Sequence, residues 1–158
     1  QASLTGHLVL STIHTNTAIG ALTRLANMGV QPYLLSNSIV GLVAQRLLRV
    51  LCTHCREAYT ADDYECGLLG ADTANPPTIY REKGCDKCAH EGYRGRQGIY
   101  EVVTVDDELR RMIHSGASEL DLEKHARTRS TSIRDDGVAK VLAGSTSIDE
   151  LLRVTTKE

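Results

Sequence analysis

Four cysteines in two pairs of identical spacing could together bind one metal ion. The pairs are Cys52-Thr-His-Cys55 and Cys85-Asp-Lys-Cys88. A C-x-x-C spacing places two thiolates on one tight turn, so two such turns offer the four sulfur ligands of a structural zinc. Four protein ligands leave no open position for water or substrate, so the sequence predicts a structural zinc site and not a catalytic one.

The alternatives for these cysteines are disulfide bonds, a redox dithiol or a mixed ligand set. Cys66 makes the number of cysteines odd and no signal-peptide pattern is visible, so we expect a reducing compartment and free thiols. A thiol redox protein needs one exposed C-x-x-C, not two facing pairs. His54 and His90 could replace a cysteine ligand, but four cysteines already complete the set. We expect Cys66 to be a small buried hydrophobe.

The metal should matter for folding. Residues 56–84 separate the two pairs, more than the usual spacing of about 15–20 residues, so the metal closes a loop with room for a helix over residues 61–69. Structural zinc binds with about 10–16 kcal/mol, whereas a typical domain is stable by about 5–15 kcal/mol. The segment should therefore lose its shape without the ion.

Two histidines flank an apolar run near the start of the chain. Residues 7–14 are rich in β-forming side chains and lie between Gly6 and a polar loop, which predicts a buried strand of a parallel sheet. His7 and His14 would lie about 20 Å apart on it, too far to share a metal. His14, at the carboxyl end, is the better functional candidate, because open α/β sheets bind ligands there; both could also be structural.

A glycine-spaced basic loop is expected at residues 92–98. Its guanidinium groups, Arg94 and Arg96, suit phosphate or a flat heterocycle, and the glycines allow close backbone approach; the alternative is a solvated turn. The whole chain has 18 basic and 20 acidic side chains and a formal net charge of −2. A nucleic-acid-binding surface would be more basic, so we expect no nucleic-acid partner.

The remaining patterns predict strands and helices in alternation, followed by helices alone. A helix capped by Asn16 should end at Gly29, and a second should open at Pro32 and run toward Arg46. Short strands are expected at residues 47–51 and 99–105. Four further helices should begin after Asp106, Ser118, Ser132 and Ser147, which have the types of N-cap residues.

Composition indicates an ordinary globular protein. Hydrophobic residues make up 41% and charged residues 24% of the 158. No stretch approaches the roughly 20 apolar residues of a transmembrane helix, so we expect a cytoplasmic location. The chain starts without Met directly before a predicted strand, and we expect it to be a piece of a longer protein.

Residues 5–18 resemble the histidine box of the secretion and pilus ATPases, the hexameric P-loop motors that drive type II secretion and type IV pilus assembly. The cysteine pattern, residues 92–101 and residues 133–155 are similar to the same family, in the same order. Residues 113–117 and 125–129 favour the type II secretion branch over the pilus branch.

The resemblance implies an α/β fold that is the C-terminal part of a RecA-like P-loop NTPase. Residues 1–51 would belong to the ATPase core, 52–92 to an inserted zinc module, 93–105 to a return to the core, and 106–158 to a C-terminal helical subdomain. ATP and Mg²⁺ would be cofactors of the full-length homo-hexamer. The sequence contains no G-x-x-x-x-G-K-[ST] phosphate loop, so we expect this stretch alone to be inactive.

The resemblance also implies roles for single residues. His14 and His7 would face the nucleotide as catalytic residues, Arg96 and Arg94 would bind it, and the four cysteines would hold zinc. The metal module would contact the inner-membrane platform and cytoplasmic-domain proteins of the secretion machine, placing the motor peripherally at that membrane. The competing hypothesis is a stand-alone zinc-dependent module that binds protein or nucleic acid, which leaves the histidines and arginines unexplained.

Overall fold

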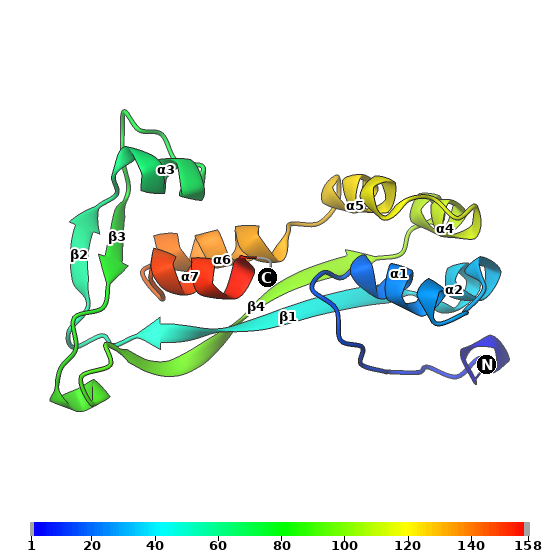
Figure 1. The fold of residues 1–158 in the computed structure, drawn as a ribbon, viewed down its shortest axis with the longest axis horizontal. Coiled ribbons are helices and arrows are strands. Elements are labelled where there is room, and N and C mark those ends of the chain that lie inside the picture. The colour runs from blue at the N-terminus through cyan, green and yellow to red at the C-terminus, as the bar shows by residue number, and fades with distance from the viewer. Residues whose placement is uncertain (1, 157–158) are drawn as a thin grey trace. The chain divides into compact units, whose positions relative to one another are not determined.

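The computed structural model describes residues 2–156, which form two compact units. Unit 1 comprises Gln1–Ala44 and Tyr100–Ser132, and unit 2 comprises Gln45–Ile99 and Ile133–Glu158. Two long strands, β1 (Gly41–Leu51) and β4 (Tyr93–Thr104), pair with each other and contribute residues to both units. They run in opposite directions (Figure 1).

Unit 1 contains a helical layer around a single apolar core. Its helices are α1 (Gly20–Asn27), α2 (Pro32–Ser38), α4 (Asp107–His114) and α5 (Glu119–Arg127), preceded by the 3₁₀ turn η1 (Ala2–Thr5). Helix α2 packs on α4. The core consists of Ala18, Ile19, Leu22, Leu35, Val103, Val105, Leu109, Ile113, Leu122 and Ala126.

Unit 2 holds the cysteine pairs and the C-terminal helices. Strands β2 (Glu57–Thr60) and β3 (Thr78–Arg81) are antiparallel, and α3 (Asp63–Leu69) connects them. The 3₁₀ turn η2 (Asp86–Cys88) directly follows Cys85 and contains Cys88, and α6 (Ile133–Leu142) packs on α7 (Ile148–Thr155). The core consists of Leu48, Ala61, Cys66, Leu69, Ile79, Ile99, Val141, Ile148 and Leu151.

Several helix boundaries confirm the expectations from the sequence. The side chains of Asp106, Ser118 and Ser147 accept hydrogen bonds from the third backbone N–H that follows each of them, as N-caps do. Helix α6 begins at Ile133, directly after Ser132. The predicted helix over residues 61–69 is α3, capped by Asp62. The buried Cys66 lies inside it, as expected.

The predicted buried strand over residues 7–14 was wrong for this structure. The segment has no regular secondary structure, and Leu8 and Leu10 are 82% and 89% exposed. A buried parallel strand needs hydrogen-bonding neighbours, but among residues 2–156 the strands pair only as β1 with β4 and β2 with β3. The expected cap Asn16 does not precede the following helix directly: α1 begins at Gly20 with Ile19 at the N-cap position and no side-chain cap, and Thr17 Oγ1 accepts from Gly20 N at 2.9 Å.

Two other boundaries differ from the prediction. The second helix stops at Ser38 and does not continue to Arg46, because Ile39 is extended and β1 begins at Gly41. Strand β4 begins at Tyr93, so Arg94 and Arg96 lie within a strand and not in a loop. In both cases β1–β4 pairing, a long-range contact, extends strands beyond the runs that the local pattern indicated.

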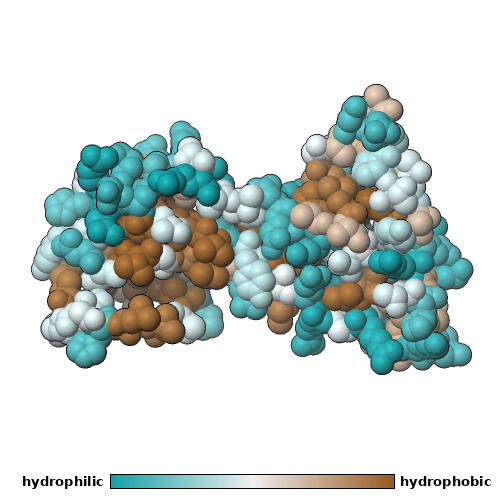
Figure 2. Space-filling model, turned by 180° about the vertical axis from the view of Figure 1, so that it is seen from behind, coloured by the Kyte–Doolittle hydropathy of each residue, from teal (hydrophilic) through white to brown (hydrophobic). Residues whose placement is uncertain are grey.

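The structure is thus mixed α/β, with two small two-stranded sheets among the described residues. Apolar surface is exposed on both units in the view of Figure 2. The exposed apolar side chains include Val43 and Val102 on β1 and β4. Among the described helices, none is long and apolar enough to cross a membrane.

Candidate metal centre

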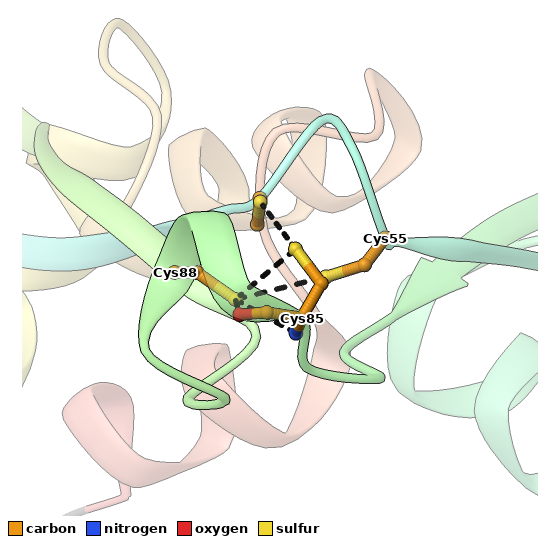
Figure 3. Close-up of side chains that lie close together, drawn as sticks. Cys55, Cys85 and Cys88 are labelled. Carbon is orange, nitrogen blue, oxygen red and sulfur yellow. Dashed lines mark hydrogen bonds between the residues drawn. The ribbon is translucent and has the colours of Figure 1, made fainter.

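The four predicted ligands converge in unit 2. The sulfur atoms of Cys52, Cys55, Cys85 and Cys88 all lie within 4.8 Å of one another. The Cys52–Cys85 sulfur distance is 4.0 Å, and Cys88 lies 3.8 Å from both Cys55 and Cys85 (Figure 3). Tetrahedral zinc with bonds of about 2.3 Å separates its sulfur ligands by about 3.8 Å. The donor set and its spacing therefore fit a four-coordinate metal ion.

Each cysteine pair lies on a hydrogen-bonded turn, the first directly after β1 and the second around η2, which Cys85 precedes and Cys88 ends. The first follows β1, and the N–H groups of Cys55 and Arg56 donate to the carbonyl of Cys52. In the second, the N–H groups of Cys88 and His90 donate to the carbonyl of Cys85. Ala89 and His90 both adopt left-handed backbone conformations, with φ of 50° and 62°. These tight turns direct both thiols of a pair toward the same point.

Backbone N–H groups prepare one sulfur to be a thiolate. Cys88 Sγ accepts from the N–H of Cys85 at 3.2 Å and from the N–H of Gly92 at 3.3 Å. Burial raises the pKa of Cys88, but these donors outweigh it and lower that pKa to about 7. Burial and the neighbouring thiols raise the pKa of Cys55 to about 11. The backbone donors therefore favour the thiolate form of Cys88 more than that of Cys55.

The other candidate ligands lie outside this cluster. His54 is exposed, and His90 is exposed and contacts Asp86 with its Nε2 3.0 Å from the carboxylate. Cys66 is fully buried in the core of unit 2, where burial raises its pKa. Over residues 2–156, the four cysteines form the only group of three or more possible His, Cys, Asp or Glu ligands.

The histidines and arginines predicted to serve a nucleotide are exposed and belong to different units. His7 and His14 lie in the irregular segment of unit 1, with His7 Nδ1 3.0 Å from Thr5 Oγ1. Arg94 and Arg96 are exposed on β4, in unit 2. Their roles stay predictions.

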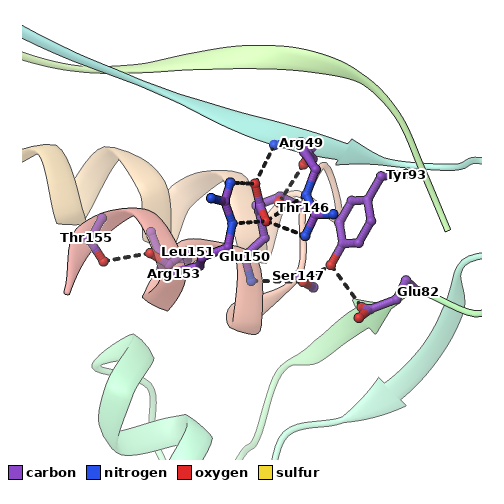
Figure 4. A network of polar contacts seen from close by, with 9 residues as sticks. All are labelled: Arg49, Glu82, Tyr93, Thr146, Ser147, Glu150, Leu151, Arg153 and Thr155. Carbon is purple, nitrogen blue, oxygen red and sulfur yellow. Dashed lines mark hydrogen bonds and ion pairs between the residues drawn. The ribbon is translucent and has the colours of Figure 1, made fainter. Parts of the chain in front are cut away.

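A buried polar network close to the cysteine cluster was missed by sequence reasoning (Figure 4). Glu150 on α7 has a fully buried side chain that binds Arg49 on β1 at 2.8 Å and Arg153 at 2.7 Å. Burial raises the pKa of Glu150, but the two guanidinium groups outweigh it and lower that pKa to about 2. Glu150 was recognisable only as a residue near a helix start, because Arg49 lies far away in the sequence.

Unit 1 has its own ionic cluster, also missed. Asp106 caps α4 and binds His125 at 3.0 Å and Arg129 at 2.7 Å. Hydrogen bonds to its carboxylate lower the pKa of Asp106 to about 2; the largest effect comes from the backbone N–H of Leu109, followed by His125 and Arg129. The cluster lines a cavity of about 290 Å³ with the apolar side chains of Val102 and Ala126. The Asp106 and His125 pairing fixes the α4–α5 connection.

Comparison with known proteins places the whole chain in one group. A family described as "Type II/IV secretion system protein" matches residues 1–153. Type II secretion system protein E of Pseudomonas aeruginosa is 60% identical over 158 residues, 100% of this chain and 32% of the relative. Type II secretion system ATPase E of Vibrio cholerae is 55% identical over 155 residues, 98% of this chain and 31% of the relative. A putative type II secretion system protein E of Escherichia coli is 44% identical over 156 residues, 99% of this chain and 32% of the relative. The chain thus spans about a third of the length of these relatives.

Proposed function

Since the chain belongs to the type II/IV secretion system protein family, we propose that it is the C-terminal part of a hexameric ATPase that powers protein export by type II secretion. The observation that carries the proposal is the similarity to a type II secretion ATPase over nearly the whole chain. We propose a cytoplasmic motor, attached to the inner membrane through partner proteins.

The catalytic chemistry of this motor requires residues that the 158 do not contain. Phosphoryl transfer depends on a phosphate-binding loop, a magnesium ion and a positioned water, and no phosphate-loop motif occurs in the sequence. We propose that ATP and Mg²⁺ bind only in the longer protein. In it, residues 7–14 would lie within a RecA-like core, and other parts of the longer protein would cover the exposed Leu8 and Leu10.

Within that core, His14 and His7 would face the nucleotide, and Arg96, with Arg94, would contact it. The exposure of all four side chains supports this role, because none is used for packing inside the described units. An exposed guanidinium can contact phosphate oxygens through several N–H groups.

The four cysteines would hold one Zn²⁺, which supplies a closed structural crosslink between the two turns. The cysteines would thereby keep β2, α3 and β3 in a fixed module that contacts the inner-membrane platform. Tyr64, exposed on α3 beside Asp63, offers an amphipathic side chain for such a contact.

The proposal is tested by ATP hydrolysis and export together. The full-length protein should hydrolyse ATP and restore export to cells that lack their type II secretion ATPase, whereas the 158-residue chain alone should do neither. Hydrolysis by the isolated chain, or normal export from cells whose full-length protein lacks residues 52–92, would contradict the proposal.

A further inference from the structure

One short segment binds the chain on both sides of the metal centre. Residues 145–150, at the start of α7, contact β1 just before Cys52 and β4 just after Cys88. Because the two cysteine pairs are far apart in sequence, contacts that hold their turns near each other should favour the binding of one metal by all four sulfurs.

On the side of the first pair, three residues of this segment, Ser145, Thr146 and Glu150, hold the end of β1 by hydrogen bonds. Leu51 N donates to the carbonyl of Ser145 at 2.9 Å, and Thr146 Oγ1 donates to the carbonyl of Arg49 at 2.8 Å. The Glu150 carboxylate accepts from the backbone N–H of Arg49 at 2.9 Å and from its guanidinium. The residue directly before Cys52 is therefore fixed to the segment that begins α7.

On the side of the second pair, Tyr93 makes the connection. Its hydroxyl donates to Glu82 at 3.0 Å and lies 2.6 Å from Ser147 Oγ, which in turn accepts from the N–H of Glu150 (Figure 4). Arg49 lies over the Tyr93 ring, 4.2 Å from its centroid. The segment 145–150 thus holds both strands through one continuous set of hydrogen bonds.

Gly92 transmits this arrangement to the sulfurs. Its N–H donates to Cys88 Sγ at 3.3 Å, and its carbonyl accepts from the N–H of Cys52 at 2.8 Å. It adopts a φ of 77°, and a Cβ at this position would collide with the side chain of Glu82. Gly92 therefore touches both cysteine pairs, and the next residue, Tyr93, is attached to α7.

We propose that the docking of α7 on Tyr93 preorganises the four cysteines, so that metal binding and the position of α7 are coupled. The inference rests on the proposed zinc site and adds Tyr93 and Ser147 as positioning residues for it. Groups that orient metal ligands from outside the ligand set change metal affinity by about 10–100-fold when removed. Coupling is reciprocal, so the bound metal must also stabilise the docked α7.

The test measures metal affinity in the 158-residue chain by competition between the protein and a chelator for Zn²⁺, with Co²⁺ as a spectroscopic probe. Tyr93→Phe keeps the ring under Arg49 and removes the hydroxyl, and should weaken binding about tenfold. Ser147→Ala should do the same. The matched controls are Tyr33→Phe, on an exposed tyrosine of unit 1, and Ser118→Ala, which removes the cap of α5 in unit 1; both should bind Zn²⁺ like the unmodified chain.

The reciprocal readout is amide hydrogen exchange with and without Zn²⁺. Removal of the metal should speed exchange in α7 and leave α4 unchanged. The coupling would be overturned if Tyr93→Phe and Ser147→Ala bound Zn²⁺ as tightly as the unmodified chain. It would also be overturned if hydrogen exchange in α7 were the same with and without Zn²⁺. Either result would leave the zinc site intact. An unmodified chain that binds no Zn²⁺ would instead overturn the proposed zinc site, and the coupling with it.

Discussion

The backbone N–H of Cys52 donates to the carbonyl of Gly92 across 2.8 Å. This hydrogen bond joins the first cysteine pair to the backbone that follows the second, and Gly92 N–H also donates to Cys88 Sγ. The two pairs are therefore linked through backbone as well as through any shared metal. The described chain contains no other cluster suited to a metal.

Loss of one ligand should release the metal. Cys85→Ser should abolish stoichiometric zinc binding, because a serine hydroxyl is a poor substitute for a thiolate ligand of zinc. Elemental analysis of the purified chain gives the zinc content. Cys66→Ala is the matched control: it removes a buried thiol outside the cluster and should keep one zinc per chain. Full zinc content in Cys85→Ser would contradict the assignment.

Alanine substitutions at two glycines with similar backbone conformations can distinguish the cost of backbone strain from the cost of steric crowding. Gly92 and Gly95 have φ of 77° and 83°, but only at Gly92 would a Cβ meet another side chain, that of Glu82. Gly95→Ala should cost about 1–2 kcal/mol for the left-handed backbone. Gly92→Ala should cost about 1–3 kcal/mol more from overpacking and weaken zinc binding. Urea unfolding compares the two variants, and equal losses would contradict this account of Gly92.

The buried Glu150 should be a major contributor to the stability of unit 2. Glu150→Gln leaves Arg49 and Arg153 without their carboxylate, and breaking a buried ion pair costs about 3–5 kcal/mol. The exposed guanidinium of Arg153 can recover part of its hydration, so we expect the lower end of this range. Denaturant unfolding measures the loss, and Glu91→Gln, at an exposed position, should change stability by less than about 0.5 kcal/mol. A Glu150→Gln variant as stable as its control would refute the prediction.

Stability should fall in acid through two carboxylates. The pKa values of Asp106 and Glu150 are lowered from 3.8 and 4.5 to about 2. A carboxyl group with a depressed folded-state pKa stabilises the fold above its unfolded pKa and loses that contribution as pH falls through the folded value. Stability should therefore decline between about pH 4.5 and pH 2.

The pH dependence can be assigned with a double variant. Chemical denaturation at a series of pH values should give a smaller decline when Asp106→Asn and Glu150→Gln are combined than in the unmodified chain. An equally steep decline in the double variant would assign the acid sensitivity to other groups.

Much of the local structure could be predicted from the sequence, because its signals are short-range. Ser118 and Ser147 precede helices, and their hydroxyl oxygens accept hydrogen bonds from backbone N–H groups of those helices. The C-x-x-C spacing alone predicted that the thiols lie on tight turns. The Leu35, Ile39 and Leu42 spacing imitated a helix, however, and the pairing of β1 with β4 prevailed.

Long-range polar partners were out of reach of pattern reasoning. The pairing of Arg49 with Glu150 joins a strand to a helix about a hundred residues later, and no local spacing marks it. At the exposed apolar run of residues 7–14, by contrast, a local signal was present but the expected strand did not form. Its β-rich composition favoured a strand, but a strand forms only where neighbouring strands supply hydrogen bonds.

The proposed role of His14 can be examined in the full-length protein. If His14 orients groups around the γ-phosphate, His14→Ala should lower the turnover of ATP while leaving nucleotide binding nearly unchanged, because the lost contact would matter mainly in the transition state. Steady-state hydrolysis and equilibrium binding of ATP measure the two effects. His54→Ala, at another exposed histidine, should hydrolyse ATP normally; normal turnover in His14→Ala would return His14 to a structural role.

The most direct test of the central claim is export by cells whose only type II secretion ATPase is the full-length protein with Cys85→Ser. We predict that export stops while the protein still binds ATP, because the zinc module would lose its shape and the residues proposed to contact the nucleotide lie outside residues 52–92. Export at the level of the unmodified protein would contradict the claim that this chain supplies a metal-held part of the secretion motor.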